Sequence, residues 1–237
     1  MITIYQFESS PLCEKVRRIF GYKGIEYRIH EVDRSKAQEL RHVSPFGKFP
    51  AIDDDGVPVC DSTDIAYYLD RKFPQRPLIP ADPVLAAQTH IIEDWADESL
   101  YFYEITMRLS WEHNARHTIK AIMSTLPKHL TEEQALALVL AGSQQLVAAQ
   151  GLGRKTPQQV VADVQRHLKA IAALLKQSKW LVGDSITLAD IAVLSQLNCL
   201  LFAREVGDAI KQYPDIVSWA ERVDCAAPAE PWRPLHA

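Results

Sequence analysis

The chain has few cysteines and no hydrophobic stretch long enough to cross a membrane. Its four cysteines are spread over 237 residues, and none are spaced like a metal-binding motif. Such sparse cysteines are typical of the reducing cytosol, so we expect a cytoplasmic protein. No basic segment followed by an apolar run opens the chain, so no signal peptide is predicted. No window reaches the ~18 apolar residues that a membrane helix requires, and no membrane partner is expected.

Neither acidic nor basic residues are concentrated in one long segment of the chain. The sequence contains 26 basic and 30 acidic residues, for a net charge of −4. Basic residues occur only as pairs or short clusters, so no nucleic acid is expected as a partner. Apolar residues make up 47% of the chain, which is enough for a sizeable core. The length allows one large or two modest domains.

The first 78 residues alternate between strand and helix patterns. A helix begins at Ser10-Pro11, with Ser at the N-cap and Pro at the first helical position, and stops at Gly21 and Gly24. Asp53-Asp-Asp-Gly56 is a turn that joins two short strands into a hairpin. The strands are expected at 2–7, 25–32, 49–52 and 58–60, and the helices at 10–24, 35–43 and 61–69. The order is therefore βαβαββα.

The rest of the chain is expected to be helical. Four prolines within ten residues, from Pro74 to Pro83, mark a stiff linker, and helical patterns follow it. We therefore expect an α/β domain over 1–78, an all-α domain over 84–225 and an extended tail over 226–237. Thr187 and Asp190 form a capping box before an almost wholly apolar helix. This box is expected to serve folding, and losing it to cost about 0.5–2 kcal/mol.

Three motifs in this order resemble the glutathione transferase family. They are Ser10-Pro-Leu-Cys13 at a helix start, Gly47-Lys-Phe-Pro50-Ala-Ile52, and Asp61-Ser62. The Thr187–Asp190 box resembles that of the family's second domain. The resemblance implies a thioredoxin-like domain that binds glutathione as co-substrate and a helical domain that receives a small electrophile. It also implies a homodimer and no metal.

The resemblance places Ser10 at the catalytic position. A helix N-terminus carries partial positive charge, which favours the thiolate form of a thiol placed there. In the family, a residue at this position donates a hydrogen bond to the glutathione thiolate. The alternatives are that Ser10 is only an N-cap, or that Ser9 or Tyr5 fills the role. Cys13 is interpreted as a packed helix residue.

The other two motifs are expected to hold the tripeptide. The resemblance implies a cis peptide bond between Phe49 and Pro50, with the Phe49 backbone paired to the cysteinyl part of glutathione. Lys48 is expected to meet the glycyl carboxylate, and the alternative is a solvated lysine. Asp61 and Ser62 open a helix, and its N–H groups suit the γ-glutamyl carboxylate. They are expected to cap that helix at the same time.

Two further features are interpreted without a catalytic role. The carboxylates Glu93, Asp94, Asp97 and Glu98 are expected on a solvated or subunit-facing surface, since one helix face offers too few converging ligands for a metal. The aromatic residues Tyr101, Phe102, Tyr103 and Trp111 line the second-substrate pocket or belong to the core. Two alternative functions stay open: a non-catalytic glutathione-binding or adaptor protein, and a thiol transferase that uses Cys13.

Overall fold

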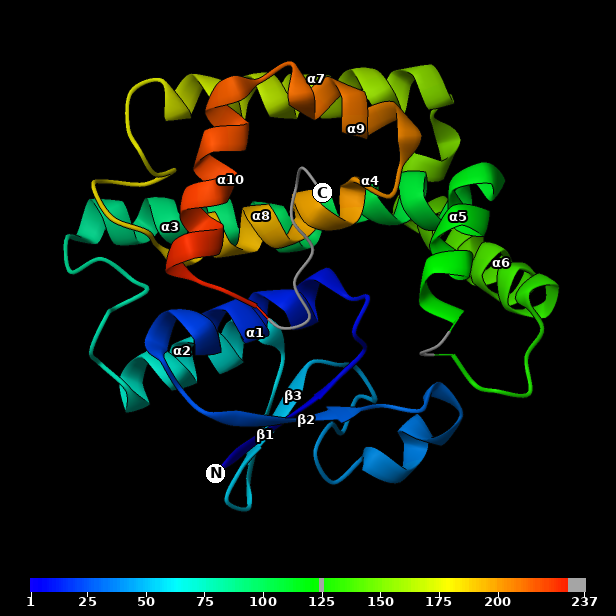
Figure 1. Ribbon diagram of the computed structural model, residues 1–237, viewed down its shortest axis with the longest axis horizontal. Helices are drawn as coiled ribbons and strands as arrows, with labels where there is room; N and C mark the ends of the chain where they lie inside the picture. Colours follow the sequence, from blue (N-terminus) through cyan, green and yellow to red (C-terminus); the bar gives the residue numbers. More distant parts are fainter. Residues whose placement is uncertain (124–125, 230–237) are drawn as a thin grey trace.

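A four-stranded mixed sheet forms the base of the N-terminal part in the computed structural model, which describes residues 1–123 and 126–229 (Figure 1). Its strand order is β2-β1-β3-β4. Strands β1 (Ile2–Gln6) and β2 (Tyr27–Glu31) are parallel, and β3 (Ala51–Asp54) pairs antiparallel with β1 and with β4 (Val57–Cys60). The helices of this part are α1 (Pro11–Lys23), the 3₁₀ helix η1 (Arg34–Leu40) and α2 (Ser62–Lys72). This arrangement confirms the predicted βαβαββα order.

Three local details differ from the sequence-based expectation. The third strand begins at Ala51 rather than Phe49, because Pro50 has no N–H to donate to a strand ladder. The helix expected over 35–43 is a shorter 3₁₀ segment. Helix α2 continues to Lys72, one turn past the expected end. The predicted cis bond between Phe49 and Pro50 is confirmed, and no other cis bond occurs among residues 1–123 and 126–229.

Helices make up the remainder of the described chain, as predicted. Two of them, η2 and η3, are π-helical turns on either side of α4, which the sequence pattern does not indicate. The elements are α3 (Pro83–Trp95), η2 (Ala96–Leu100), α4 (Tyr101–Glu104), η3 (Ile105–Ser110), α5 (Glu112–Ile122), α6 (Glu132–Gln150), the 3₁₀ turn η5 (Leu152–Arg154), α7 (Pro157–Leu175), α8 (Leu188–Leu200), α9 (Arg204–Lys211) and α10 (Pro214–Ala226). Most of the predicted tail, 230–237, lies outside the described residues. No helix of the described part is long and apolar enough to span a membrane.

Helix α8 is the centre of the molecule. All of its residues are buried, and it packs against α1, α3 and α10 (Figure 1). The predicted capping box is present at its start, where Asp190 Oδ2 accepts the Thr187 N–H at 2.9 Å. Asp190 Oδ1 also accepts the Leu181 N–H at 2.9 Å and the Trp219 indole N–H at 2.8 Å. Asp190 therefore joins α8, the preceding loop and α10, which is more than a cap does.

Replacing Asp190 by Ala should lower the free energy of unfolding by at least about 3 kcal/mol. The reason is that the change leaves several buried donors without an acceptor, each at roughly 1–3 kcal/mol. Thr131→Ala is the matched control, because Thr131 is an exposed N-cap of another capping box and should lose only about 1 kcal/mol. Urea denaturation measures both. Equal losses in the two variants would show that Asp190 acts as a cap alone.

Candidate functional site

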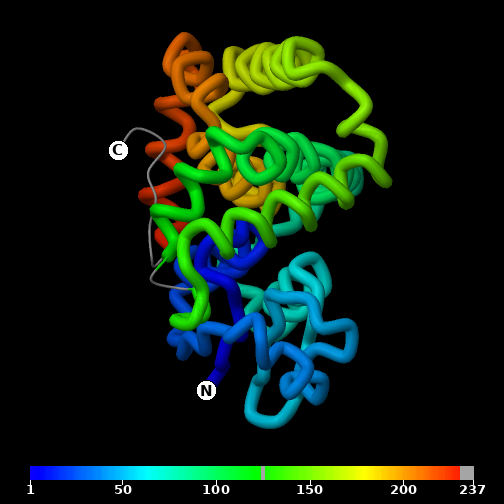
Figure 2. Tube along the Cα trace, turned by 90° about the vertical axis from the view of Figure 1, so that its right-hand side faces the viewer, coloured from blue at the N-terminus to red at the C-terminus, as the bar shows by residue number. Residues whose placement is uncertain are grey.

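Figure 2 shows the sheet domain below the helices of the C-terminal part. A cleft of about 920 Å³ lies between the two. The N-terminal residues of α1 and α2 and the loop before Pro50 form one side. Residues of η2, α4, η3, α5 and α6 form the other. All six predicted site residues line this cleft: Ser10, Lys48, Phe49, Pro50, Asp61 and Ser62.

The Ser10 side chain caps helix α1. Its Oγ accepts the Cys13 backbone N–H at 3.4 Å, and Pro11 occupies the first helical position. A hydroxyl accepts through its lone pairs and donates through its proton. Accepting the cap bond does not use the Ser10 proton, so capping and thiolate stabilisation are compatible in one side chain.

The loop that carries Ser10 is held from the helical domain. Arg108 donates to the Ser9 carbonyl at 3.1 Å, and the Cys199 thiol approaches the same oxygen at 3.8 Å. Arg108 forms a buried ion pair with Glu104, one turn earlier. Burial alone would lower the pKa of Arg108, but the Glu104 carboxylate outweighs it and raises that pKa. Arg108 was not identified from the sequence, although its i,i+4 spacing from Glu104 in an apolar stretch is a usable signal.

The structure separates the alternatives to Ser10. Ser9 also lines the cleft, whereas Tyr5 and Cys13 are not among the lining residues. Cys13 is fully buried in a small cluster with Phe49 and Ala51. Burial raises the pKa of its thiol to about 11, against smaller opposing effects of hydrogen bonds from Ser10 and Phe7. Cys13 therefore lacks both the exposure and the thiolate character of a redox cysteine.

The loop before Pro50 presents backbone groups to the cleft. Within the described ranges, neither the N–H nor the C=O of Phe49 forms a hydrogen bond with another protein group. Its ring packs edge-on against Phe7, with centroids 5.5 Å apart. Ser44 braces the turn, because its hydroxyl donates to the Lys48 carbonyl and accepts the Lys48 N–H. The Lys48 side chain is exposed at the cleft.

Asp61 holds an unusual backbone conformation at the start of α2. Its φ of 78° is positive, which costs a non-glycine residue about 1–3 kcal/mol and is concentrated at functional sites. Asp61 Oδ1 accepts the N–H groups of Thr63 and Asp64 at 2.8 and 3.3 Å. Its Oδ2 accepts no hydrogen bond from the described residues. The predicted cap is present, and this exposed carboxylate keeps one oxygen that the cap does not use.

Behind Ser62 lies a buried charge cluster, which we name the Lys15 cluster: Lys15, Ser62, Thr63, Glu93 and Asp97. Lys15 Nζ forms ion pairs with Glu93 and, at 2.6 Å, with Asp97. It also donates to Ser62 Oγ and Thr63 Oγ1 at 3.3 and 3.2 Å. The Ser62 hydroxyl donates to Asp97 at 3.1 Å, and that of Thr63 to Glu93 at 2.6 Å. The cluster therefore ties α1 and α2 to the helical domain.

The cluster corrects the expectation of a solvated carboxylate surface. Glu93 and Asp97 are only 1% and 9% exposed, whereas Asp94 and Glu98 are exposed. Burial raises the pKa of Asp97, partly offset by Lys15. For Lys15, burial alone would lower the pKa, but Asp97 and Glu93 outweigh it and raise the pKa. No group of three or more metal-ligating side chains converges anywhere in the described chain.

Of the four aromatic residues that were expected in the second-substrate pocket or the core, two line the cleft and two pack in or against the core. Tyr101 and Phe102 line the cleft. Burial raises the pKa of the Tyr101 hydroxyl to about 12, so it stays protonated at neutral pH. Tyr103 belongs to the core, where its hydroxyl donates to Asp163 at 3.1 Å. Trp111 packs against the core and does not line the cleft.

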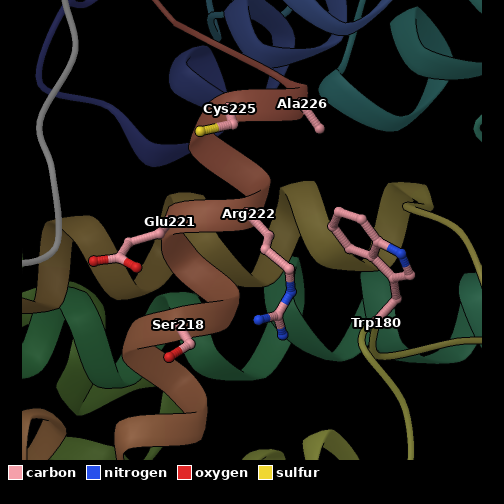
Figure 3. A pocket seen from close by; sticks show the side chains of 6 residues that line it. All are labelled: Trp180, Ser218, Glu221, Arg222, Cys225 and Ala226. Carbon is pink, nitrogen blue, oxygen red and sulfur yellow. The ribbon is translucent and has the colours of Figure 1, made fainter.

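A second hollow of about 520 Å³ lies over α10 and carries none of the predicted residues. Figure 3 shows its six lining side chains, Trp180, Ser218, Glu221, Arg222, Cys225 and Ala226. Arg222 already donates to the Lys179 carbonyl at 3.0 Å. None of its six lining residues lies at the start of a helix. The interdomain cleft is therefore the candidate active site.

Comparison with known proteins identifies the class of this fold and site. The model of the glutathione S-transferase N-terminal domain matches residues 4–77, and that of the C-terminal domain matches residues 133–224. The two matched regions contain the site loop before Pro50, both helix starts, and helices α6 to α8. The chain belongs to the glutathione S-transferase family.

Individual relatives match almost the full length. Protein LigF of Sphingobium sp. strain SYK-6 is 29% identical, covering 96% of this chain and 91% of LigF. An isoprene-epoxide–glutathione S-transferase of Rhodococcus sp. strain AD45 is 25% identical, covering 94% of this chain and 98% of that protein. A solved glutathione S-transferase of Methylobacillus flagellatus with glutathione bound has a TM-score of 0.65 at 22% identity, covering 97% and 100%.

Replacing Lys15 by Met should lower the free energy of unfolding by about 3–5 kcal/mol near pH 8, because two buried carboxylates lose their cation. The pKa of Asp97 is already raised by burial, and removing Lys15 raises it further. The folded variant then binds a proton more tightly than the unfolded chain, so its deficit shrinks as the pH falls toward 4. Urea denaturation between pH 4 and pH 8 measures the free energy of unfolding of the variant and of the wild type.

The control is Lys36→Met, which removes an exposed lysine and should leave stability nearly unchanged at every pH. Lys15→Arg keeps the charge and should recover part of the loss. A deficit of Lys15→Met that is the same at pH 5 and pH 8 would contradict the ionic role of the cluster.

Proposed function

We propose that this transferase binds glutathione in the interdomain cleft and uses Ser10 to stabilise its thiolate for attack on an electrophile. The γ-glutamyl end lies at the start of α2, where the positive end of the helix favours its carboxylate and Asp61 Oδ2 its ammonium. The cysteinyl part pairs with the Phe49 backbone, and the glycyl carboxylate lies toward Lys48. The sulfur then lies at the start of α1, beside Ser10.

The chemistry required of the protein is modest. The positive end of α1 and the Ser10 proton favour the thiolate over the thiol. The thiolate sulfur donates an electron pair to an electrophilic carbon, a C–S bond forms, and the leaving group departs with its bonding electrons. When the electrophile is an epoxide, a ring C–O bond breaks. The oxygen keeps the bonding electrons and then takes a proton. Positioning and charge stabilisation supply the catalysis, with no covalent enzyme intermediate.

One observation carries the assignment: the six residues that match the family motifs, far apart in sequence, line a single cleft. The thiol transferase alternative through Cys13 is disfavoured because that thiol is buried and its pKa is raised. A non-catalytic glutathione-binding or adaptor protein would keep the same binding groups, so it differs from the enzyme in turnover. Measurable turnover of glutathione with an aryl halide distinguishes the enzyme from the adaptor.

Replacing Ser10 by Ala should lower kcat/KM about 10- to 100-fold at pH 7, because a hydrogen bond to a charged group contributes roughly 1.5–3 kcal/mol. The thiol pKa rises when this donor is lost, so the pH–rate profile should shift to higher pH. The loss of kcat/KM in Ser10→Ala should therefore become smaller at pH values above the raised pKa of the glutathione thiol. The dissociation constant of glutathione should change little, since the carboxylate contacts remain.

Ser9→Ala and Ser10→Thr are the matched variants. Ser9→Ala should keep the wild-type profile, and Ser10→Thr should restore most of the activity because it keeps the hydroxyl. An unchanged profile in Ser10→Ala, or an equal shift in Ser9→Ala, would remove Ser10 from the mechanism.

We also propose that the protein is a homodimer, as the family resemblance implies. An apolar stripe on α3 supports this: Val84, Ala87 and Ile91 lie on one exposed face, three and four residues apart. Ile91 is 66% exposed. Exposed apolar stripes of this kind mark interaction surfaces.

Ile91→Asp should convert the dimer to a monomer, because it places a charge in an apolar contact. Light scattering coupled to size exclusion gives the mass directly. Leu174→Asp, on an exposed position of α7, is the control and should stay dimeric. A dimer that persists in Ile91→Asp would place the interface elsewhere.

A further inference from the structure

Arg34 is a cation of the cleft that lacks an acidic partner. It lies at the start of η1 and lines the cleft. Its guanidinium stacks over the Phe7 ring, 3.8 Å from the ring centroid. Because the Ser10 N–H donates to the Phe7 carbonyl at 3.0 Å, this stacking holds the guanidinium against the loop that carries Ser10. Within the described residues the Arg34 side chain forms no ion pair and donates no hydrogen bond.

The surroundings of Arg34 disfavour its positive charge. Burial of the guanidinium lowers its pKa even though the residue as a whole is exposed, and the charge of Arg108 lowers it further. Arg108 itself is paired with Glu104, whereas Arg34 has no such pair among the described residues. Three groups act in the opposite direction and raise the pKa: Cys13, Glu31 and Tyr101.

The carboxylate among these three groups already has other donors. Glu31 accepts the side-chain N–H of Gln6 at 3.1 Å and the backbone N–H of Glu8 at 2.7 Å. The α6 side of the cleft offers no alternative, since its lining residues, such as Leu138 and Leu146, are apolar. An arginine keeps its charge at neutral pH, so Arg34 presents an uncompensated cation to the cleft.

A second donor lies on the helical side of the cleft. Tyr101, at the start of α4, lines the cleft, and its hydroxyl forms no hydrogen bond with the described residues. The hydroxyl keeps its proton at neutral pH, because burial raises its pKa to about 12. Arg34 and Tyr101 each affect the pKa of the other, so the two groups are electrostatic neighbours. A guanidinium and a hydroxyl are donors that suit a carboxylate.

The two carboxylates of glutathione do not account for this pair of donors. In the proposed function, one of them lies at the start of α2 and the other toward Lys48. The sulfur lies beside Ser10, on the loop against which Arg34 is stacked. A group held between Arg34 and Tyr101 is therefore close to the sulfur and belongs to the second substrate.

We infer that the electrophile carries a carboxylate, which binds between the Arg34 guanidinium and the Tyr101 hydroxyl, near the carbon that the sulfur attacks. This inference rests on the proposed function, because it takes the sulfur position from Ser10. A carboxylate that enters a cleft loses hydration and needs a cation in return. Arg34 supplies that cation, and its planar guanidinium can donate two parallel hydrogen bonds to the two carboxylate oxygens.

Binding of matched glutathione adducts tests the inference without requiring turnover. S-(carboxymethyl)glutathione and S-(carbamoylmethyl)glutathione have nearly the same shape but differ by one negative charge, and the 2-carboxyethyl and 2-carbamoylethyl adducts form a longer pair. In at least one pair, calorimetry on the wild type should show the acid binding about tenfold or more tightly than the amide. This preference should shrink between about 0.1 M and 1 M NaCl, where the Debye length falls from ~10 Å to ~3 Å.

Arg34→Gln should weaken the preferred acid at least about tenfold and leave its amide within about twofold. Arg34→Lys keeps the charge but not the planar fork, so it should retain part of the preference. Tyr101→Phe should weaken the acid about three- to tenfold. The control is Arg41→Gln, because Arg41 is an exposed arginine at the other end of η1 that does not line the cleft. Circular dichroism and melting temperature confirm that each variant is folded.

The possible failures are distinguishable. If wild type binds none of the four adducts, the proposed function itself fails. If it binds the amides but prefers neither acid, Arg34 is only a solvated arginine and the inference is overturned. If Arg34→Gln weakens an acid and its amide equally, Arg34 belongs to the glutathione site, which also overturns the inference. An equal loss of the preference in Arg41→Gln would assign it to the general charge of the surface and overturn the inference as well.

Discussion

The buried ammonium of Lys15 is the interaction on which the arrangement of the site depends. An unpaired charge at that depth costs several kcal/mol, so the fold has to bring acceptors to it. Glu93 and Asp97 supply the charge, and Ser62 and Thr63 complete the hydrogen bonds. These acceptors come from α2, α3 and η2. Satisfying one cation on α1 therefore fixes the position of α2 and docks the helical domain at the same time.

That docking explains why the starts of α1 and α2 open into one cleft. Ser10 and Asp61 each cap a helix, and the cap uses neither the hydroxyl proton of Ser10 nor Oδ2 of Asp61. The Ser10 loop is fixed from the opposite side by Arg108, whose charge is balanced within the same segment by Glu104. Two buried ion pairs, one behind each helix start, thus hold polar groups at the cleft in the rigid positions that charge stabilisation requires.

The local chemistry of the site could be predicted from the sequence, whereas its long-range supports could not. Ser10-Pro11 predicts a capped helix, and the segment from Asp53 to Gly56 predicts a turn. Each prediction depends only on residues that are close in the sequence. Lys15 and Glu93 are 78 residues apart, and Arg108 and Ser9 are 99 apart, so no periodicity relates them. The carboxylates on α3 and η2 therefore suggested a solvated face, because only tertiary packing reveals the lysine that neutralises two of them. The family resemblance predicted Pro50, where spacing alone would not specify a cis bond.

The cleft separates residues that the fold requires from residues that it does not. Lys15, Glu104 and Arg108 are buried, and changing any one of them leaves its own ion-pair partner uncompensated. Leu138 and Leu146 are exposed, so a different side chain there removes little buried area from the folded protein. Helix α6 is anchored independently of them, since Ser143 and Gln144 donate to the backbone carbonyls of Leu109 and Ser110. The polar part of the cleft is thus constrained by folding, while the shape of the apolar part can change without loss of the core.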